Sequence, residues 1–294
     1  MYVPLAGITD SLSIDGVSGT NDSIRFNLTT ALPGVDIGTV NIDRIEIMES
    51  SLLMTSTGNI WLNASNGITF SGTLQTTTGN ITVRGSQIGT GDNSSITLDG
   101  LRVNATGAIT SVDGNISLKA AAFRRVSEQL HGLFVDGGTI ATTGTGNNVG
   151  NIEIVVRTHK GSSSGLVNYG AHLINGMVST VDGNITLTGT GAYASSDNAG
   201  LFLDNFTIAS TGSGNIDMLS TVDWSVVDDL CILKNSAISV VDGNLSITAK
   251  EGDDENRIQF EGVELRSLVV DGCSISSSGI GTIDLVGLTP DWGV

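Results

Sequence analysis

The chain has 294 residues, and 30 acidic side chains against 13 basic ones give it a formal net charge of −17 at pH 7. Its 39 glycines accompany only 3 prolines, which excludes collagen, and its many Ile, Val and Leu residues exclude a disordered acidic chain. The negative charge would repel phosphates, so no nucleic-acid partner is predicted.

The first 37 residues contain one alternating segment, at Ile24, Phe26 and Leu28, and we expect an irregular first coil or cap over residues 1–37. The opening MYVPLAGITDSLSID lacks the basic and apolar regions of a signal peptide, so Met1 is expected to begin a mature or internal fragment. The sequence contains no run of about 18 apolar residues, and no membrane insertion is predicted.

Residues 38–294 form the second predicted region, in which the phrase Gly-Asn-Ile-x-Leu or a close variant recurs. Its copies are about 20 to 38 residues apart, a range typical of solenoids and propellers. Each phrase alternates apolar and polar residues, as a half-buried strand does. The nine copies begin at Gly38, Gly58, Gly79, Gly114, Gly150, Gly183, Gly214, Gly243 and Gly281.

Two further strands are expected before each phrase, because apolar residues recur there at constant offsets such as Leu133, Val135 and Ile140. Three short strands per repeat predict an all-β right-handed parallel β-helix of about nine coils and roughly 40 Å, at ~4.8 Å per coil. A propeller blade needs four antiparallel strands, for which the shortest repeats are too small. Helical periodicity is confined to the segment from Lys119 to Leu130.

The asparagine of the phrase is expected to stack from coil to coil in a structural amide ladder. This ladder comprises Asn59, Asn80, Asn115, Asn151, Asn184, Asn215 and Asn244. Three aspartates of the variant VDGN, at positions 113, 182 and 242, fall two coils apart, roughly 10 Å, which is too far to share one Ca²⁺ ion. We therefore predict no cofactor, and nothing in the sequence supports bound Ca²⁺.

Both cysteines are predicted to be free. Cys231 takes an inward position that leucine occupies in other repeats, so it is expected to act as a small core residue. Cys273 falls in a turn, five positions away in the repeat, and this offset separates the two sulfurs too far for a disulfide.

The longer repeats carry extra residues just after the phrase, which predicts loops inserted at one corner of the helix. Basic residues and all three histidines gather at or beside the first two insertions, and they suggest a cationic binding patch. The alternative is a solvated loop edge without a ligand. No metal site is predicted, because the histidines lack a zinc-ligand spacing. The patch comprises Arg124, Arg125, His131, Arg157, His159, Lys160 and His172.

The phrases GNITLTGTG, VDGNISL, TSTGNIWLNASNGITFSG and GLFLDNFTIASTGSGNIDM resemble repeats of filamentous-haemagglutinin-like large exoproteins. The resemblance covers about Gly38 to Leu285 and specifies an architecture. The Asn-Pro-Asn motifs of the family's secretion domain are absent from the sequence. The resemblance implies an adhesin-type right-handed parallel β-helix, extracellular or at the cell surface, within a longer bacterial chain.

The expected function is therefore structural or adhesive, with glycans or a protein surface receptor bound through the stacked inserted loops. Little sequence follows the last repeat, which predicts continuation in a longer chain or end-to-end self-association. The alternative is a polysaccharide lyase or glycoside hydrolase on a pectate-lyase-like β-helix. No catalytic constellation supports the enzyme, although acidic residues cluster around positions 223–229 and 251–255.

Overall fold

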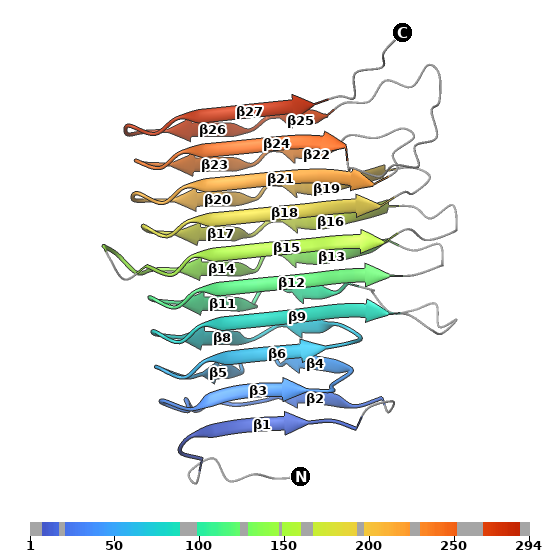
Figure 1. Ribbon diagram of the computed structural model, residues 1–294, viewed down its shortest axis with the longest axis vertical. Helices are drawn as coiled ribbons and strands as arrows, with labels where there is room; N and C mark the ends of the chain where they lie inside the picture. Colours follow the sequence, from blue (N-terminus) through green and yellow to red (C-terminus); the bar gives the residue numbers. More distant parts are fainter. Residues whose placement is uncertain are drawn as a thin grey trace.

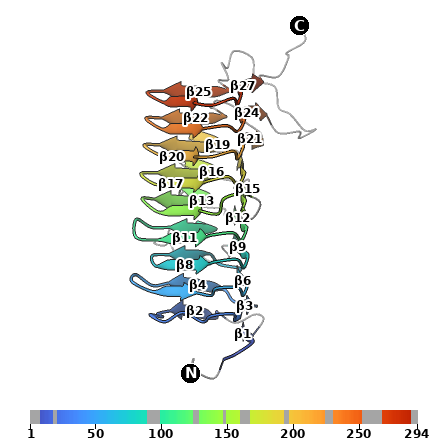
Figure 2. The ribbon, with the colours of Figure 1, turned by 90° about the vertical axis from the view of Figure 1, so that its left-hand side faces the viewer.

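Each repeat contributes strands to three parallel β-sheets that run side by side along a rod (Figures 1 and 2). This computed structural model describes residues 8–17, 21–88, 99–123, 129–146, 149–159, 167–192, 197–223, 230–251 and 267–288. Sheets A, B and C contain ten, nine and eight strands respectively. All the pairings between these strands are parallel, so the predicted right-handed parallel β-helix of about nine coils is confirmed.

The strands of each sheet follow one another at intervals along the chain. Sheet A consists of β1 (Ser11–Asp15), β3 (Asp36–Val40), β6 (Ile60–Ala64), β9 (Ile81–Ile88), β12 (Ile116–Phe123), β15 (Ile152–His159), β18 (Ile185–Ala192), β21 (Ile216–Asp223), β24 (Leu245–Glu251) and β27 (Ile283–Leu288). Sheet B consists of β2 (Ser23–Phe26), β4 (Arg44–Ile47), β7 (Ile68–Phe70), β10 (Leu101–Val103), β13 (Leu130–Asp136), β16 (Val167–Ile174), β19 (Asp197–Asp204), β22 (Cys231–Lys234) and β25 (Leu268–Asp271). Sheet C consists of β5 (Leu52–Met54), β8 (Thr73–Thr76), β11 (Ala108–Ser111), β14 (Thr139–Thr142), β17 (Met177–Thr180), β20 (Thr207–Ser210), β23 (Ala237–Val240) and β26 (Ser274–Ser277).

The predicted phrases form the strands of sheet A from β6 onward, and their apolar residues point into one continuous core. In β18, for example, Ile185 and Leu187 are buried while Thr186 between them is exposed. Ile185 pairs with Ile152 in one neighbouring strand and with Ile216 in the other. Identical apolar positions thus stack along the rod, and each coil covers the apolar surface of the next.

The first copy of the phrase has a different register from the one predicted. Ile37, and not Val40, pairs with Ile60, so the strand of this coil begins three residues earlier. Residues 8–17 and 21–37, within the expected irregular coil or cap, contribute β1, β2 and the beginning of β3. The strand begins within GVDIG at residues 34–38, which lacks the asparagine of the repeated phrase. The later segment GTVNI contains an asparagine and therefore matched the phrase better.

Glycine at the start of the phrase is required by the close stacking of the coils. A Cβ atom added at Gly79 would lie 1.8 Å from the carbonyl oxygen of Gly58, and one at Gly114 equally close to that of Gly79. The corner between sheets B and C depends on positive φ angles. Asn175, Asn205 and Asn235 have φ of 55°, 51° and 48° there, in a region that asparagine tolerates better than most residues.

The insertion corner differs from the prediction, because much of it is strand. β12 continues to Phe123 and pairs along its length with β9 and β15, so the predicted helical periodicity from Lys119 is wrong. The buried Ala120 and Ala122 alternate with outward residues, and pairing on both sides outweighs the helix propensity of alanine. The extended strands of sheet A pack on the beginnings of sheet B strands, as Ala122 does on Leu130.

No α-helix occurs within the described ranges, and a search of the same residues finds no helix that could span a membrane.

Candidate functional site

The seven asparagines of the repeated phrase form one exposed column along sheet A. The side-chain Oδ1 of each accepts a hydrogen bond from the backbone N–H of the equivalent residue in the next coil, as between Asn151 and Asn184 at 2.8 Å. The column begins with Asp36, which accepts from the N–H of Asn59, and its last bond runs from Thr282 to Asn244. The geometry gives these residues a structural role.

The predicted cationic patch is divided between two sheets. Arg157 and His159 lie on the outer face of β15 in sheet A, whereas His131 and His172 lie on β13 and β16 of sheet B. Arg124, Arg125 and Lys160 lie outside the described residues. The division arises because the strands of both sheets extend into the insertion corner, which carries their outward side chains onto separate surfaces.

On the outer face of sheet B, Asp99, His131 and His172 form a chain of hydrogen bonds. Asp99 Oδ1 lies 2.9 Å from His131 Nδ1, and His131 Nε2 lies 3.1 Å from His172 Nδ1. The other oxygen of Asp99 accepts a hydrogen bond from Arg102 Nη1 at 3.0 Å. The side chains of Asp99 and His131 are only 3% and 7% exposed, so most of this series of hydrogen bonds is shielded from solvent.

The carboxylate at one end of this hydrogen-bonded series determines the direction of its bond with His131. An ionised Asp99 can only accept, so His131 Nδ1 is the donor in their hydrogen bond. Burial first, and the neighbouring His131 second, lower the pKa of His172 to about 3. At neutral pH His172 is therefore uncharged.

Aromatic rings surround the two histidines. Phe134, His172 and Phe202 occupy equivalent positions on three consecutive strands of sheet B. The ring of His172 lies 5.0 Å from that of Phe134 and 4.9 Å from that of Phe202, and Tyr169 stacks on Phe202 at 4.7 Å. We call the set Asp99, Arg102, His131, Phe134, Tyr169, His172 and Phe202 the histidine cluster.

The histidine cluster combines apolar rings with cationic groups. The guanidinium of Arg102 lies 4.4 Å from the ring centre of Phe134, and Lys234 Nζ lies 5.5 Å from that of Phe202. Phe134, His172 and Phe202 are each partly exposed. A polar ligand with an apolar face would find both kinds of contact here, because aromatic rings with a few placed polar groups are typical of binding sites.

His159 has a separate environment on sheet A. Its ring stacks on Phe123, with centroids 4.0 Å apart and planes 15° from parallel. Burial first, and then Arg157, lower the pKa of His159, while Asp223 acts in the opposite direction. No group of three or more histidine, cysteine or acidic side chains within the described ranges could hold a metal ion.

The cysteines and Asp182, one of the VDGN aspartates, lie in positions that suggest structural roles. Cys231 is fully buried in the core, Cys273 is partly exposed, and both thiols are free. Burial raises the pKa of Cys231 to about 12.

Asp182 accepts hydrogen bonds from the backbone N–H groups of Gly146 and Ser213, both at 2.9 Å, and these bonds lower its pKa. Asp182 thus joins the turns of neighbouring coils.

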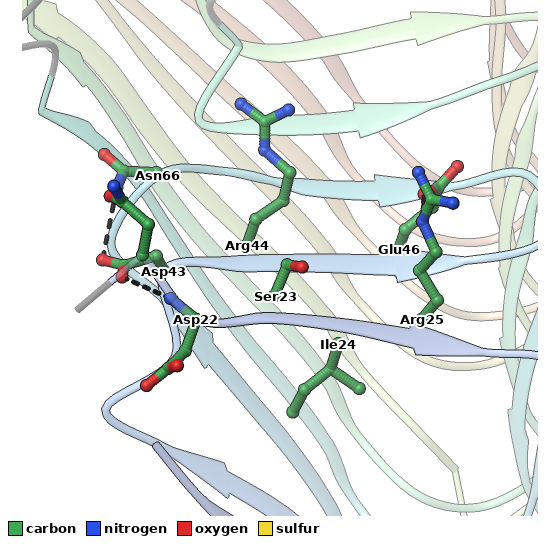
Figure 3. Close-up of a pocket in the computed structure, with 9 residues that line it drawn as sticks. Asp22, Ser23, Ile24, Arg25, Asp43, Arg44, Glu46 and Asn66 are labelled. Atoms are coloured by element: carbon green, nitrogen blue, oxygen red, sulfur yellow. Dashed lines mark hydrogen bonds and ion pairs between the residues drawn. The ribbon is translucent and has the colours of Figure 1, made fainter. Parts of the chain in front are cut away.

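A pocket of about 390 Å³ lies beside the paired strands β2 and β4, near the beginning of the rod (Figure 3). Figure 3 shows Asp22 and Asn66 converging on Asp43, which accepts hydrogen bonds from the N–H of Asp22 at 2.9 Å and from Asn66 Nδ2 at 3.2 Å. Arg25 forms an ion pair with Glu46 at 2.9 Å. The polar side chains Asp43, Asn66, Arg25 and Glu46 of this pocket are thus already bonded within the protein. The histidine cluster is therefore the stronger candidate site.

Comparisons with protein-family models, curated proteins and solved structures find no match to this chain.

Several members of the histidine cluster were missed in the sequence, although a signal for them exists. The segments DGLRV, HGLFV, YGAHL and AGLFL share one pattern, in which the second residue is glycine and the third and fifth are apolar and point inward. The first and fourth residues of the pattern are the variable positions. The first position gives Asp99, His131 and Tyr169, and the second gives Arg102, Phe134, His172 and Phe202. Aligning these positions across repeats would have placed all of them on one face.

Proposed function

We propose that this chain is a structural and adhesive segment of a large secreted or cell-surface bacterial protein, and that it binds glycans through the histidine cluster. The observation that supports this proposal most is the row of partly exposed rings of Phe134, His172 and Phe202 outside the core. Rings on the outside of a β-helix contribute little to its central packing, whereas they offer flat apolar surfaces to a ligand.

The chemistry of the histidine cluster suits a sugar. The C–H face of a pyranose ring can pack on Phe134 or Phe202, while its hydroxyl groups can form hydrogen bonds with the imidazole of His172 and accept from Arg102. The rod itself supports an adhesive role, since its coils hold these side chains at regular spacing without any rearrangement. The likeness to filamentous-haemagglutinin-like repeats supports the extracellular location and the membership of a longer chain.

A glycan array probed with the wild-type chain and with His172→Ala/Phe202→Ala tests this proposal, in the presence and absence of Ca²⁺. We expect the wild type to bind a defined set of glycans and the variant to lose most of the signal. Trp61→Ala is the control, because it removes an exposed aromatic residue from sheet A. Equal binding by wild type and double variant would contradict the histidine cluster as the site. No binding by the wild type would favour a spacer segment.

One observation favours the alternative of a polysaccharide lyase. The Asp99–His131–His172 series ends in an uncharged imidazole that is partly exposed, although its pKa of about 3 makes it a weak general base at neutral pH. A lyase would remove the proton beside the carboxylate of a uronic acid and release the glycosidic oxygen, leaving an unsaturated sugar. Ultraviolet absorbance of that product, lost in His172→Gln, would support catalysis, and its absence with all acidic glycans tested would contradict it.

A further inference from the structure

A hollow of about 380 Å³ lies on the outer face of sheet A, across β9, β12 and β15. Its lining includes the small residues Gly85, Ala120 and Ala121. Gly85 and Ala120 are buried, and Ala121 is partly exposed. Long exposed side chains stand around them. The residues lining the hollow are Asn63, Arg84, Gly85, Ser86, Lys119, Ala120, Ala121, Val155 and Arg157.

Strand register places three cationic side chains of the hollow close together. Arg84 and Lys119 are directly opposite each other on β9 and β12, and Arg157 is opposite Ala121, two residues further along. Neighbouring strands are ~4.8 Å apart and each residue rises ~3.3 Å along a strand, so all three cationic side chains begin within roughly 12 Å of one another. Like charges directly opposite each other destabilise a sheet, and Arg84 and Lys119 form such a pair.

The positive charge of the hollow is only partly neutralised by the protein. Lys119 Nζ lies 3.2 Å from Glu153 Oε2, which also accepts a hydrogen bond from Ser117 at 2.8 Å. Within the described part of the chain, Arg84 and Arg157 form no ion pair with a carboxylate. Two arginines of the hollow therefore have no ion-pair partner among the described residues, on a protein whose net charge is −17.

We infer that this hollow binds the carboxylate of an acidic saccharide, such as a uronic acid unit of a polysaccharide. Arginine forms paired hydrogen bonds with a planar carboxylate. The carboxylate of Glu153 already pairs with Lys119, so the ligand's carboxylate is expected at Arg84 and Arg157. The hollow is large enough for a sugar ring, since ligand pockets begin at about 300 Å³. A single seated carboxylate would relieve the repulsion between Arg84 and Lys119.

The overall charge of the chain favours a saccharide over nucleic acid. At physiological salt, charges more than ~8 Å away are largely screened, so a carboxylate seated in the hollow experiences mainly the three cationic groups and the single carboxylate of Glu153. A nucleic acid lying along the rod would carry phosphates past the exposed Asp217 and Asp223 of β21. This inference concerns another sheet than the histidine cluster and does not depend on the function proposed for that cluster.

Isothermal titration calorimetry of the whole chain with trigalacturonate tests the inference, and the methyl-esterified trimer serves as the uncharged comparison. We expect the acid to bind and the ester not to bind. Arg84→Ser/Arg157→Ser should weaken binding at least about tenfold, as expected when charge-assisted hydrogen bonds are lost. Arg44→Ser/Lys250→Ser removes the same charge elsewhere on the rod and should change the affinity less than about twofold.

Four outcomes would overturn the inference. They are the absence of trigalacturonate binding, equal binding of the ester, unchanged affinity in Arg84→Ser/Arg157→Ser, and competition by inorganic sulfate at the same concentration as trigalacturonate. Circular dichroism of each variant shows whether its β-structure is retained. His172→Ala/Phe202→Ala should keep its affinity for trigalacturonate, so the titration separates failure of this inference from failure of the histidine cluster as a glycan site.

Discussion

Removing one asparagine of the ladder should weaken the rod locally, and Asn151→Ala is the sharpest case. In the wild type, Asn151 Oδ1 accepts the N–H of Asn184 at 2.8 Å, and Asn151 Nδ2 donates to Asn115 Oδ1 at 3.2 Å. Alanine removes both bonds. A net contribution of about 0.5–1.5 kcal/mol per hydrogen bond predicts a loss of about 1–3 kcal/mol. Because the column is exposed, water can replace part of this, and we expect the lower half of that range.

The effect should be confined to the coils on either side of the substitution, since each coil contacts its neighbours. Hydrogen exchange is therefore the best assay, because it reports the opening of individual segments. We expect the backbone amide of Asn184 to exchange roughly tenfold faster for each 1.4 kcal/mol lost. Amides near Asn59, several coils away, should keep their wild-type rates.

Two further variants make this prediction specific. Asn151→Asp keeps an acceptor for Asn184 and should recover part of the protection, as Asp36 does for Asn59 at the start of the column. Asn63→Ala is the matched control, because Asn63 is an exposed asparagine of sheet A outside the column. Unchanged exchange at Asn184 in Asn151→Ala, or an equal change in Asn63→Ala, would refute the structural role of the ladder.

The folded state lowers the pKa of His172 to about 3, below its ordinary value near 6.5, so unfolding takes up a proton between these values. Stability should therefore fall as the pH drops through 6.5 toward 3, by at most about 1.4 kcal/mol per pH unit from this group. Denaturation between pH 6.5 and 4.5 should show a shallower slope in His172→Phe than in wild type, since the variant keeps the contribution of His159, whose pKa is also lowered. Gly183→Ala should cost about 3 kcal/mol or more, because its Cβ would lie 2.0 Å from the carbonyl oxygen of Gly150, and an unchanged melting temperature would contradict this close contact. Cys231 should resist thiol reagents until the protein unfolds, since burial raises its pKa to about 12, whereas Cys273 should react in the native state. Equal labelling rates for the two cysteines would be inconsistent with the buried position of Cys231.

The strands and the ladder could be predicted because they depend on contacts that recur in every coil. Ile185 and Leu187 alternate with polar residues, and this period of two identifies a strand without knowledge of its neighbours. The asparagine precedes the strand at a constant offset, so equivalent positions must stack once the coils are parallel. The first coil escaped this reasoning, because Asp36 replaces asparagine there and performs the same hydrogen-bonding role.

The surface at the insertion corner was harder to predict. Whether Lys119 to Phe123 forms a loop, a helix or a strand depends on the pairing of β12 with strands about 35 residues away on both sides. Once those residues are strand, His159 belongs to sheet A and His172 to sheet B, and a single basic patch becomes two surfaces. The separation follows from long-range pairing that no local pattern records.

The direction of the hydrogen bonds along the column has a mechanical consequence. The bond from Asn184 to Asn151, like the backbone bonds between coils, runs along the rod axis. Tension along that axis would act on the bonds of one boundary at a time, so coils should peel away in sequence under load. The 31 residues from Asn184 to Asn215 would then release roughly 100 Å of extended chain from a layer only ~4.8 Å thick. A rod built in this way would act as an extensible tether, lengthening in steps while its remaining coils keep their side-chain surfaces.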